Sequence, residues 1–481
     1  MRFQPVLKIL GFMILAVGFL ILTAIPFSLY YGEDFNPLLS SGLVTVFAGL
    51  ILTLLFRRSQ VELRSREALF IVGIGWVAAS IFGSLPYILS GVLPSFTDAF
   101  FETISGYTTT GASVIRNVEV VPHGILYWRA LSNWVGGMGI IVLSLTVLPL
   151  LGMSGKQLFK AEVSGPTKDK LTPRLVETAR VLWGLYVLVT VAETIFLMAG
   201  GMSFFDALCH SFSTIATGGF STKNASVGYY NSVYIEVVVI IFMLIGGSNF
   251  ALHYAVLKNG VAELWRDNEF VFFVFSYLVA LSVITVITVL TTYDGHFLQA
   301  LRGSAFSVMT VMSTTGFATA DFAAWAPPAQ IILLFLMFPG ALAGSTGGGI
   351  KNVRVLLLFK AAFSEVKRLL HPKIVAPVRL NGIAVEQTTL ITIGGFVILY
   401  LITFTTAAIV LSMTGLDIVT SMSAVAACLS NEGPGLSSVG PMGNYADLTA
   451  FAKWVLGGCM LIGRLEIFTI FALFSSSFWR R

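Results

Sequence analysis

The segment YTTTGASV, residues 107–114, interrupts a chain that is otherwise strongly apolar. Three other polar segments also contain a glycine. Aligned on one glycine, the four read AFFETISGYTTTGAS (99–113), ALCHSFSTIATGGFS (207–221), SAFSVMTVMSTTGFA (304–318) and SAVAACLSNEGPGLS (423–437). This alignment equates Gly111, Gly219, Gly316 and Gly435. An internal repeat of this kind sets the fold, so the remaining predictions are built on it.

The composition excludes a soluble globular domain. Of the 481 residues, 56% are hydrophobic and 11% are charged, whereas soluble domains carry about 25% charged residues. Apolar runs long enough to cross a bilayer, roughly 20 residues each, recur along the whole chain. The net charge of +5 agrees with the basic cytoplasmic loops of membrane proteins and does not require a nucleic-acid partner. We therefore expect an all-α, multi-pass membrane protein in contact with lipid.

The apolar runs predict ten spans. They are Val6–Tyr30, Leu38–Phe56, Leu69–Leu89, Ile125–Leu151, Ala179–Ala199, Val233–Leu257, Phe270–Thr291, Pro328–Phe359, Thr388–Leu411 and Leu448–Phe474. The basic connections at 57–67, Lys156–Arg174 and Lys367–Arg379 are expected in the cytoplasm, since basic loops stay inside. Both termini then lie in the cytoplasm, and the four Thr/Gly segments lie on the outer side.

Each glycine follows a short apolar segment that connects two spans on the outer side. About 13 residues cannot cross a bilayer core of about 30 Å, so each segment is predicted to enter and return as a pore loop. The expected helix starts are polar: Asp98, Asp206, Gln299 and Asp417. The last two lie farther from their glycine, which indicates either one extra helical turn or a misplaced start.

A glycine allows backbone conformations that direct carbonyl oxygens toward an axis, and rings of carbonyls replace the water shell of a cation. The alternative is four ordinary outer loops with capping Thr and Gly residues. The residues proposed to bind potassium in a selectivity filter are Thr110, Gly111, Ala112, Gly218, Gly219, Phe220, Thr315, Gly316, Phe317, Pro434, Gly435 and Leu436.

These segments, together with GSTGGGIKNVR (344–354) and LIGRLEIF (461–468), resemble the Trk/Ktr/HKT superfamily of potassium uptake proteins, and within it the bacterial TrkH branch. The resemblance implies a pseudo-fourfold pore of four M1–P–M2 units, a homodimer and a cytosolic nucleotide-binding ring of the TrkA type. It also implies potassium uptake across the bacterial inner membrane, with no organic cofactor. Since each copy aligns one glycine, and Glu432 and Pro434 lie beside the fourth, weaker discrimination against sodium is expected.

The expected organisation is two extra N-terminal helices (1–66) followed by four repeats of the same orientation. The repeats are 67–155, 156–262, 263–372 and 373–481. Parallel fourfold repetition favours a pore. The main alternative is a sodium- or proton-coupled secondary symporter, which also uses broken helices. A membrane enzyme is not expected, because no metal triad, Ser/His/Asp set or carboxylate pair converges in the spans.

The second span of the third repeat contains FPGALAGSTGGGIKNVR (338–354), whose proline and glycines cannot sustain a helix. We expect a gating loop here, whereas the matching spans of the other copies are expected to continue. The alternative is close helix packing through small residues. Arg464, inside the last span, is expected to anchor this loop or to raise a barrier to cations, the alternative being a pair with Glu466. The gate residues are Gly344, Ser345, Thr346, Gly347, Gly348, Gly349, Lys351 and Arg464.

Overall fold

The computed structural model describes residues 2–59, 65–146, 171–374 and 376–480. In these ranges the longer elements are all helices, and two short strands, β1 (Arg379–Leu380) and β2 (Ile383–Ala384), form an antiparallel hairpin. The expectation of an all-helical, multi-span protein is confirmed. The predicted repeat boundary at 155–156, the end of the Ile125–Leu151 span and most of the Lys156–Arg174 loop lie outside the described residues.

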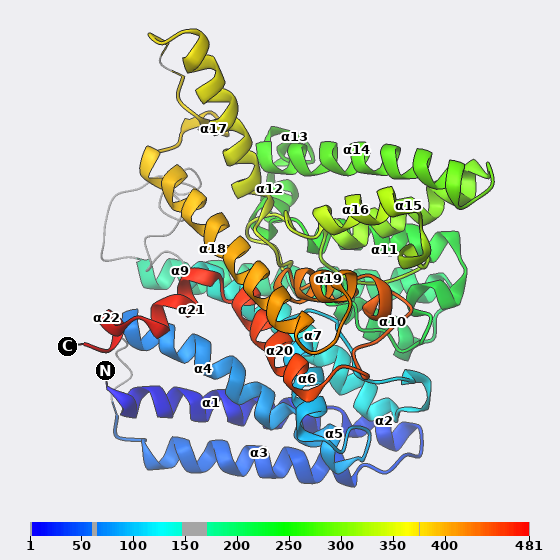
Figure 1. Cartoon of the computed structure of the whole chain (residues 1–481). Helices are drawn as coiled ribbons and strands as arrows, with labels where there is room; N and C mark the ends of the chain where they lie inside the picture. Colours follow the sequence, from blue (N-terminus) through cyan, green and yellow to red (C-terminus); the bar gives the residue numbers. More distant parts are fainter. Residues whose placement is uncertain (1, 60–64, 147–170, 375, 481) are drawn as a thin grey trace.

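The helices follow one another as three N-terminal elements and four groups (Figure 1). The N-terminal elements are α1 (Phe3–Leu22), α2 (Ile25–Tyr30) and α3 (Asn36–Leu55). The first two groups are α4 (Ser65–Gly83), α5 (Leu85–Leu89), α6 (Phe96–Tyr107) and α7 (His123–Thr146), then α9 (Leu171–Ala199), α10 (Phe204–Ile215), α11 (Val233–Gly246), α12 (Phe250–Asn259) and α13 (Ala262–Arg266). The last two are α14 (Asn268–Thr291), α15 (Phe297–Met312), α16 (Pro327–Leu336) and α17 (Asn352–Leu370), then α18 (Gln387–Ser412), α19 (Ile418–Leu429), α20 (Ala450–Arg464), α21 (Ile467–Phe474) and α22 (Ser476–Trp479).

Six helical stretches of the described chain are long and apolar enough to cross a membrane, and up to eight if each of two bent pairs is one span. Their outer faces are apolar: Phe275, Val286 and Leu290 on α14 are each more than half exposed. Large apolar side chains facing outward suit a lipid environment, while polar groups of the same helices turn inward.

The helices α1 and α3 pack closely because each presents two glycines to the other. A Cβ on Gly18 would lie 2.7 Å from the backbone nitrogen of Val46, and one on Gly49 would be 2.8 Å from the carbonyl oxygen of Gly11. Small residues at such an interface let the two backbones approach. The pair forms the lower layer in Figure 1.

Both chain ends lie at the same end of the helices (Figure 1). Arg2 forms an ion pair with Glu67 at 3.1 Å, and Arg66 donates a hydrogen bond of 2.7 Å to the carbonyl of Arg480. The N-terminus, the start of α4 and the C-terminus are therefore neighbours.

Three predicted second spans are broken, and the expectation that only the third repeat is broken is wrong. The span Val233–Leu257 is α11 and α12, bent by 101°, and the span Leu448–Phe474 is α20 and α21, bent by 113°. In the third group residues 337–351 separate α16 from α17. Only α7 continues through its glycine pair among the described second spans. After each bend a new helix begins: Asn249 is the N-cap of α12, with its side chain accepting the N–H of Ala251, and Glu466, at a φ of 62°, precedes α21.

The short helices also begin differently from the prediction. Asp98, Asp206 and Gln299 lie in the first turn of α6, α10 and α15, whereas Asp417 is the N-cap of α19. Three of these helices have 12 residues and α15 has 16. The extra helical turn therefore belongs to the third copy alone, because Asp417 marks the start of a 12-residue helix and lies three positions earlier in it than Asp98 and Asp206 do in theirs.

Candidate functional site

Each of the four short helices ends in the same backbone motif. The residue after the C-cap is left-handed, with φ between 52° and 57°, and its N–H bonds back to the helix while the next N–H reaches one carbonyl farther. In α6 these bonds run from Thr109 to Gly106 and from Thr110 to Ser105, at 2.9 and 2.8 Å. This is the Schellman arrangement, which satisfies the last carbonyls of a helix. The four left-handed residues are Thr109, Thr217, Thr314 and Asn431.

The threonine hydroxyls of the first turn explain why YTTTGASV is so polar. The hydroxyls of Thr108 and Thr110 lie 2.8 Å apart, and Thr108 also donates to the carbonyl of Ile104. Ser313 and Thr315 form the same 2.8 Å contact in the third turn. The Thr110 hydroxyl also accepts a hydrogen bond of 3.0 Å from the Asn431 amide, so these polar side chains connect the first turn to its own helix and to the fourth copy.

Two residues after each left-handed residue lies a glycine with a positive φ, between 67° and 102°. A Cβ on Gly111 would meet the carbonyl oxygen of Gly218, and one on Gly219 would meet that of Thr315. The third and fourth turns continue the series, from Gly316 to Glu432 and from Gly433 back to Thr110. All four separations are under 3.0 Å, which real Cβ atoms essentially never show. The four turns therefore form a closed ring. In it, each glycine packs against a carbonyl oxygen of the next turn, and no side chain would fit between them.

This ring corrects the alignment of the fourth copy. The glycine equivalent to Gly111 is Gly433, with φ 102°, whereas Gly435 is outside the ring and a Cβ there would meet Ser423. The triplet matching Thr110, Gly111 and Ala112 is thus Glu432, Gly433 and Pro434. The proposed triplet Pro434, Gly435 and Leu436 starts two residues late, and the Leu436 N–H bonds the Ser423 hydroxyl at 2.9 Å.

The other predicted filter residues lie in the ring segments. Thr110, Gly218 and Thr315 follow the left-handed residue of their turn, and Gly111, Gly219 and Gly316 follow them. Ala112, Phe220 and Phe317 are next and are buried. The structure thus brings together three predicted triplets and only Pro434 of the fourth.

The segment between α16 and α17 packs directly against these turns. The backbone N–H of Gly348 donates to the Thr314 hydroxyl at 2.8 Å, and the Thr217 and Thr346 hydroxyls lie 3.3 Å apart. A Cβ on Gly348 would clash with the carbonyl of Ser430. Residues 345–350 are buried. The segment therefore occupies the side of the ring where the short helices end.

The Thr346 side chain binds the segment to two helix ends of the second copy. Its hydroxyl lies 2.8 Å from the carbonyl of Ile215 and 3.0 Å from that of Gly246. Ile215 ends the short helix α10, and Gly246 ends α11. Because α11 stops at Gly246, its free carbonyl is available to the segment. The break in α11, which the sequence analysis did not predict, thus frees the carbonyl that accepts the hydrogen bond from Thr346.

Arg464, at the end of α20, holds the segment from the fourth copy. Its Nη1 donates to the carbonyl of Thr346 at 2.6 Å and its Nη2 to the carbonyl of Gly136 on α7 at 3.1 Å. Its side chain does not pair with Glu466, which pairs with Arg354 at 2.7 Å. Residues of the second, third and fourth copies therefore contact this short segment, and Arg464 connects it to Gly136 of the first copy.

Lys351 and Glu269 hydrogen-bond to the backbone of the segment and of the residues beside it. The Lys351 ammonium donates to the carbonyl of Gly347, and its backbone has a φ of 76°. One oxygen of the buried Glu269 accepts the N–H groups of Ala343 and Val353, at 2.8 and 2.9 Å. Glu269 thus bridges the two sides of the break. The predicted gate residues Gly344, Ser345, Gly347, Gly348, Gly349 and Lys351 all lie in this segment, beside Thr346 and Arg464.

Comparison with known proteins decides the family. Residues 38–481 match the TrkH family, described as a cation transport protein. The chain belongs to the TrkH family. It is 40% identical over 485 residues to the Trk system potassium uptake protein TrkH of Halomonas elongata and 41% identical over 484 residues to that of Salmonella typhimurium, with full coverage of each chain. The crystal structure of the potassium transporter TrkH from Vibrio parahaemolyticus superposes with a TM-score of 0.92, 37% identity and full coverage of both chains.

Membership of the TrkH family confirms the resemblance and the expectation of a transport protein rather than an enzyme.

The sequence analysis did not predict the left-handed residues at the ends of the short helices, although the sequence contains a signal for them. Copies one to three carry threonine two places before the glycine, and a shift of the fourth copy by two places puts Asn431 there. Asparagine is a common left-handed residue, so this shift was the better alignment.

Proposed function

We propose that this chain takes up potassium ions through a pore whose selectivity filter is the ring of four turns. The observation that carries the proposal is the cyclic packing of Gly111, Gly219, Gly316 and Gly433 against the carbonyls of the neighbouring turns. Such packing requires four backbones around one axis, which is the arrangement that replaces the hydration shell of a monovalent cation. The names of the relatives, potassium uptake proteins, support potassium as the transported ion.

The proposed ion-facing layer consists of one carbonyl from each copy. These are the carbonyls of Thr110, Gly218, Thr315 and Glu432. Neutral oxygens bind a potassium ion without holding it permanently. The short helices end at the ring, so the negative ends of their dipoles favour a cation there. Potassium is the only bound species that the proposal requires.

The segment Gly344–Gly349 is proposed as the gate beneath the filter. It is bound by residues from the second, third and fourth copies, and it contains no regular helix that would have to unfold when it moves. A backbone of this kind is tolerated at membrane depth only where protein or a water-filled cavity satisfies it. Arg464 is proposed to hold the gate in its closed position.

The proposed setting is the bacterial inner membrane, with both termini in the cytoplasm and the filter facing outward. Two N-terminal helices (1–66) then precede four parallel repeats, 67–155, 156–262, 263–372 and 373–481. The full working unit is proposed to be a homodimer with a cytosolic TrkA-type nucleotide-binding ring docked on basic inner loops such as Lys367–Arg379. The outward apolar faces described above are proposed to contact lipid.

Ion flux into liposomes containing the purified protein tests the proposal. Gradients of potassium, rubidium, sodium and lithium should give fluxes in which potassium and rubidium exceed sodium and lithium. A pore predicts flux that follows each ion's own gradient. If uptake requires a proton or sodium gradient and saturates steeply, the sodium- or proton-coupled symporter replaces the pore. If no cation moves, the proposed function is wrong.

A further inference from the structure

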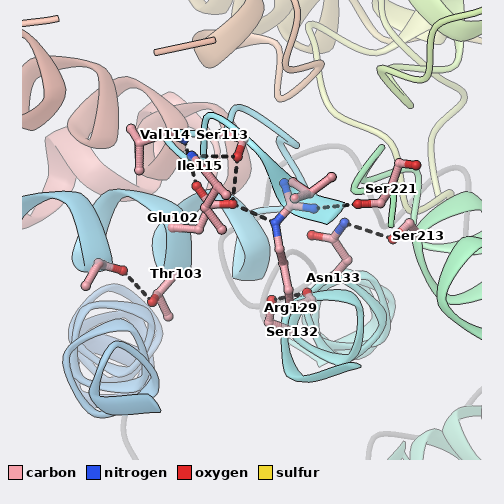
Figure 2. A network of polar contacts seen from close by, with 12 residues as sticks. Glu102, Thr103, Ser113, Val114, Ile115, Arg129, Ser132, Asn133, Ser213 and Ser221 are labelled. Carbon is pink, nitrogen blue, oxygen red and sulfur yellow. Dashed lines mark hydrogen bonds and ion pairs between the residues drawn. The ribbon is translucent and has the colours of Figure 1, made fainter. Parts of the chain in front are cut away.

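A buried ion pair lies behind the first two filter turns (Figure 2). Glu102 is in the middle of α6 and Arg129 is on α7, with the Arg129 Nε 2.6 Å from the Glu102 Oε1. The Glu102 side chain is 0% exposed and that of Arg129 is 5% exposed. Removing two charges from water costs several kcal/mol per ion, so an ion pair in this position is not explained by stability alone.

The Glu102 carboxylate also binds the chain that leaves the first turn. Its Oε1 accepts the Ser113 hydroxyl at 2.9 Å, and its Oε2 accepts the Val114 N–H at 2.8 Å. Figure 2 shows the three donors converging on this one carboxylate. Ser113 is two residues after Gly111, so the carboxylate fixes the outer end of the first filter turn.

Arg129 reaches the second turn with the opposite side of its guanidinium. Its Nη1 donates to the carbonyl of Ser221 at 3.0 Å, and the guanidinium lies 3.6 Å from the centre of the Phe220 ring. Phe220 directly follows Gly219. The stacked guanidinium adds a cation–π contact to its hydrogen bonds. One pair of side chains thus connects the first and second filter turns.

We propose that Glu102 and Arg129 are positioning residues for ion selectivity, holding the first two filter turns at a set separation. This inference rests on the proposed function. Carbonyl oxygens discriminate potassium from sodium only while their spacing and number are maintained around the ion. The pair contacts no pore-facing carbonyl of the proposed layer, and it acts through Ser113, Val114, Phe220 and Ser221.

Another ion pair provides a matched control. Arg302 on α15 binds Glu236 on α11 with two hydrogen bonds, of 2.7 and 2.8 Å, and its third contact is with Asn231. It joins the second and third copies, as Glu102 and Arg129 join the first and second. None of these three hydrogen bonds ends on a filter turn. Its removal should therefore affect stability without affecting selectivity.

The test replaces both members of each pair, so that no buried charge is left without a partner. The double variant Glu102→Gln, Arg129→Gln should lower the potassium-over-sodium flux ratio by at least about tenfold, the lower limit for one lost hydrogen bond to a charged group. The matched variant Glu236→Gln, Arg302→Gln should keep the wild-type ratio. Thermal unfolding in detergent, measured for both, separates a stability loss from a selectivity loss.

Arg129→Lys is a second variant in case the double variant does not insert. It keeps a charge for Glu102 but cannot supply the planar contact with Phe220 and a parallel donor to Ser221. Its flux ratio should also fall. A wild-type ratio in whichever variant folds, or an equal fall in the matched control, overturns the inference while the proposed function stands. If the unmodified protein moves no cation, the proposed function is wrong and the inference falls with it.

Discussion

Replacing Arg464 by Met should increase cation flux in the absence of a cytosolic partner. The change removes the guanidinium and its two hydrogen bonds, while the methionine retains an unbranched apolar stem in the same buried site. The bond that matters for gating is the one from Nη1 to the carbonyl of Thr346, at 2.6 Å, because Thr346 lies in the movable segment. The bond to Gly136 ends on α7 and does not distinguish a closed segment from an open one.

The size of the effect follows from that single bond. A hydrogen bond to a charged group contributes about 1.5–3 kcal/mol, and the Arg464 side chain is buried, so a central value of about 2 kcal/mol applies. At about 1.4 kcal/mol per factor of ten, this is a change of roughly thirtyfold in the ratio of open to closed segment. While the open form is rare, the flux should rise by the same factor.

The assay is potassium-gradient flux into liposomes that contain equal amounts of folded protein. Lys453→Met is the matched control, since Lys453 is a buried cation on the same helix whose bonds go to Asp98 and the carbonyl of Ala446 at the helix's other end. This control should not raise the flux. If Arg464→Met leaves the flux at the wild-type level or lowers it in well-folded protein, Arg464 does not hold a gate, and the glycines have a packing role.

Two further outcomes are expected. Gly433→Ala should lower the potassium-over-sodium flux ratio, because a Cβ at a φ of 102° meets the Thr110 carbonyl, whereas Gly435→Ala should change it less; the reverse order would restore the original alignment. Asp417→Ala should cost about 1 kcal/mol by removing the N-cap of α19. Hydrogen bonds from Thr420 lower the pKa of Asp417, so its stabilisation is present above the ordinary carboxyl pKa and is lost as the pH falls through the lowered pKa. Thermal unfolding at neutral and acidic pH should therefore differ between wild type and Asp417→Ala only at neutral pH, and an equal difference at both would contradict the cap.

Much of the candidate site could be predicted from the sequence because its glycine-containing motif occurs four times. Three of the four triplets proposed for the filter lie in the ring of turns, and the segment Gly344–Gly349 lies in the predicted break between α16 and α17. Glycine at a positive φ and proline at a helix break are local requirements, so they leave a local signal. The fourth copy was misaligned because Gly433 and Gly435 are both plausible glycines; Asn431, two places before Gly433, is the sequence signal that favours Gly433, and the positive φ of Gly433 decides between them.

The sequence alone determined that the chain is a multi-pass helical protein with four polar, glycine-containing turns, since hydrophobic length and glycine freedom are properties of short segments. Only the tertiary structure decided which residues of different copies meet. The ring closure from Gly433 to Thr110, the bond from Arg464 to Thr346 and the bond from Arg129 to the carbonyl of Ser221 all join residues far apart in the sequence. The local sequence around a carboxylate in a short helix, or around an arginine in a span, does not indicate which residue will be its partner. Its partner is chosen when the four copies pack around one axis, because a buried charge must then be satisfied by whatever donor or acceptor the neighbouring copy presents.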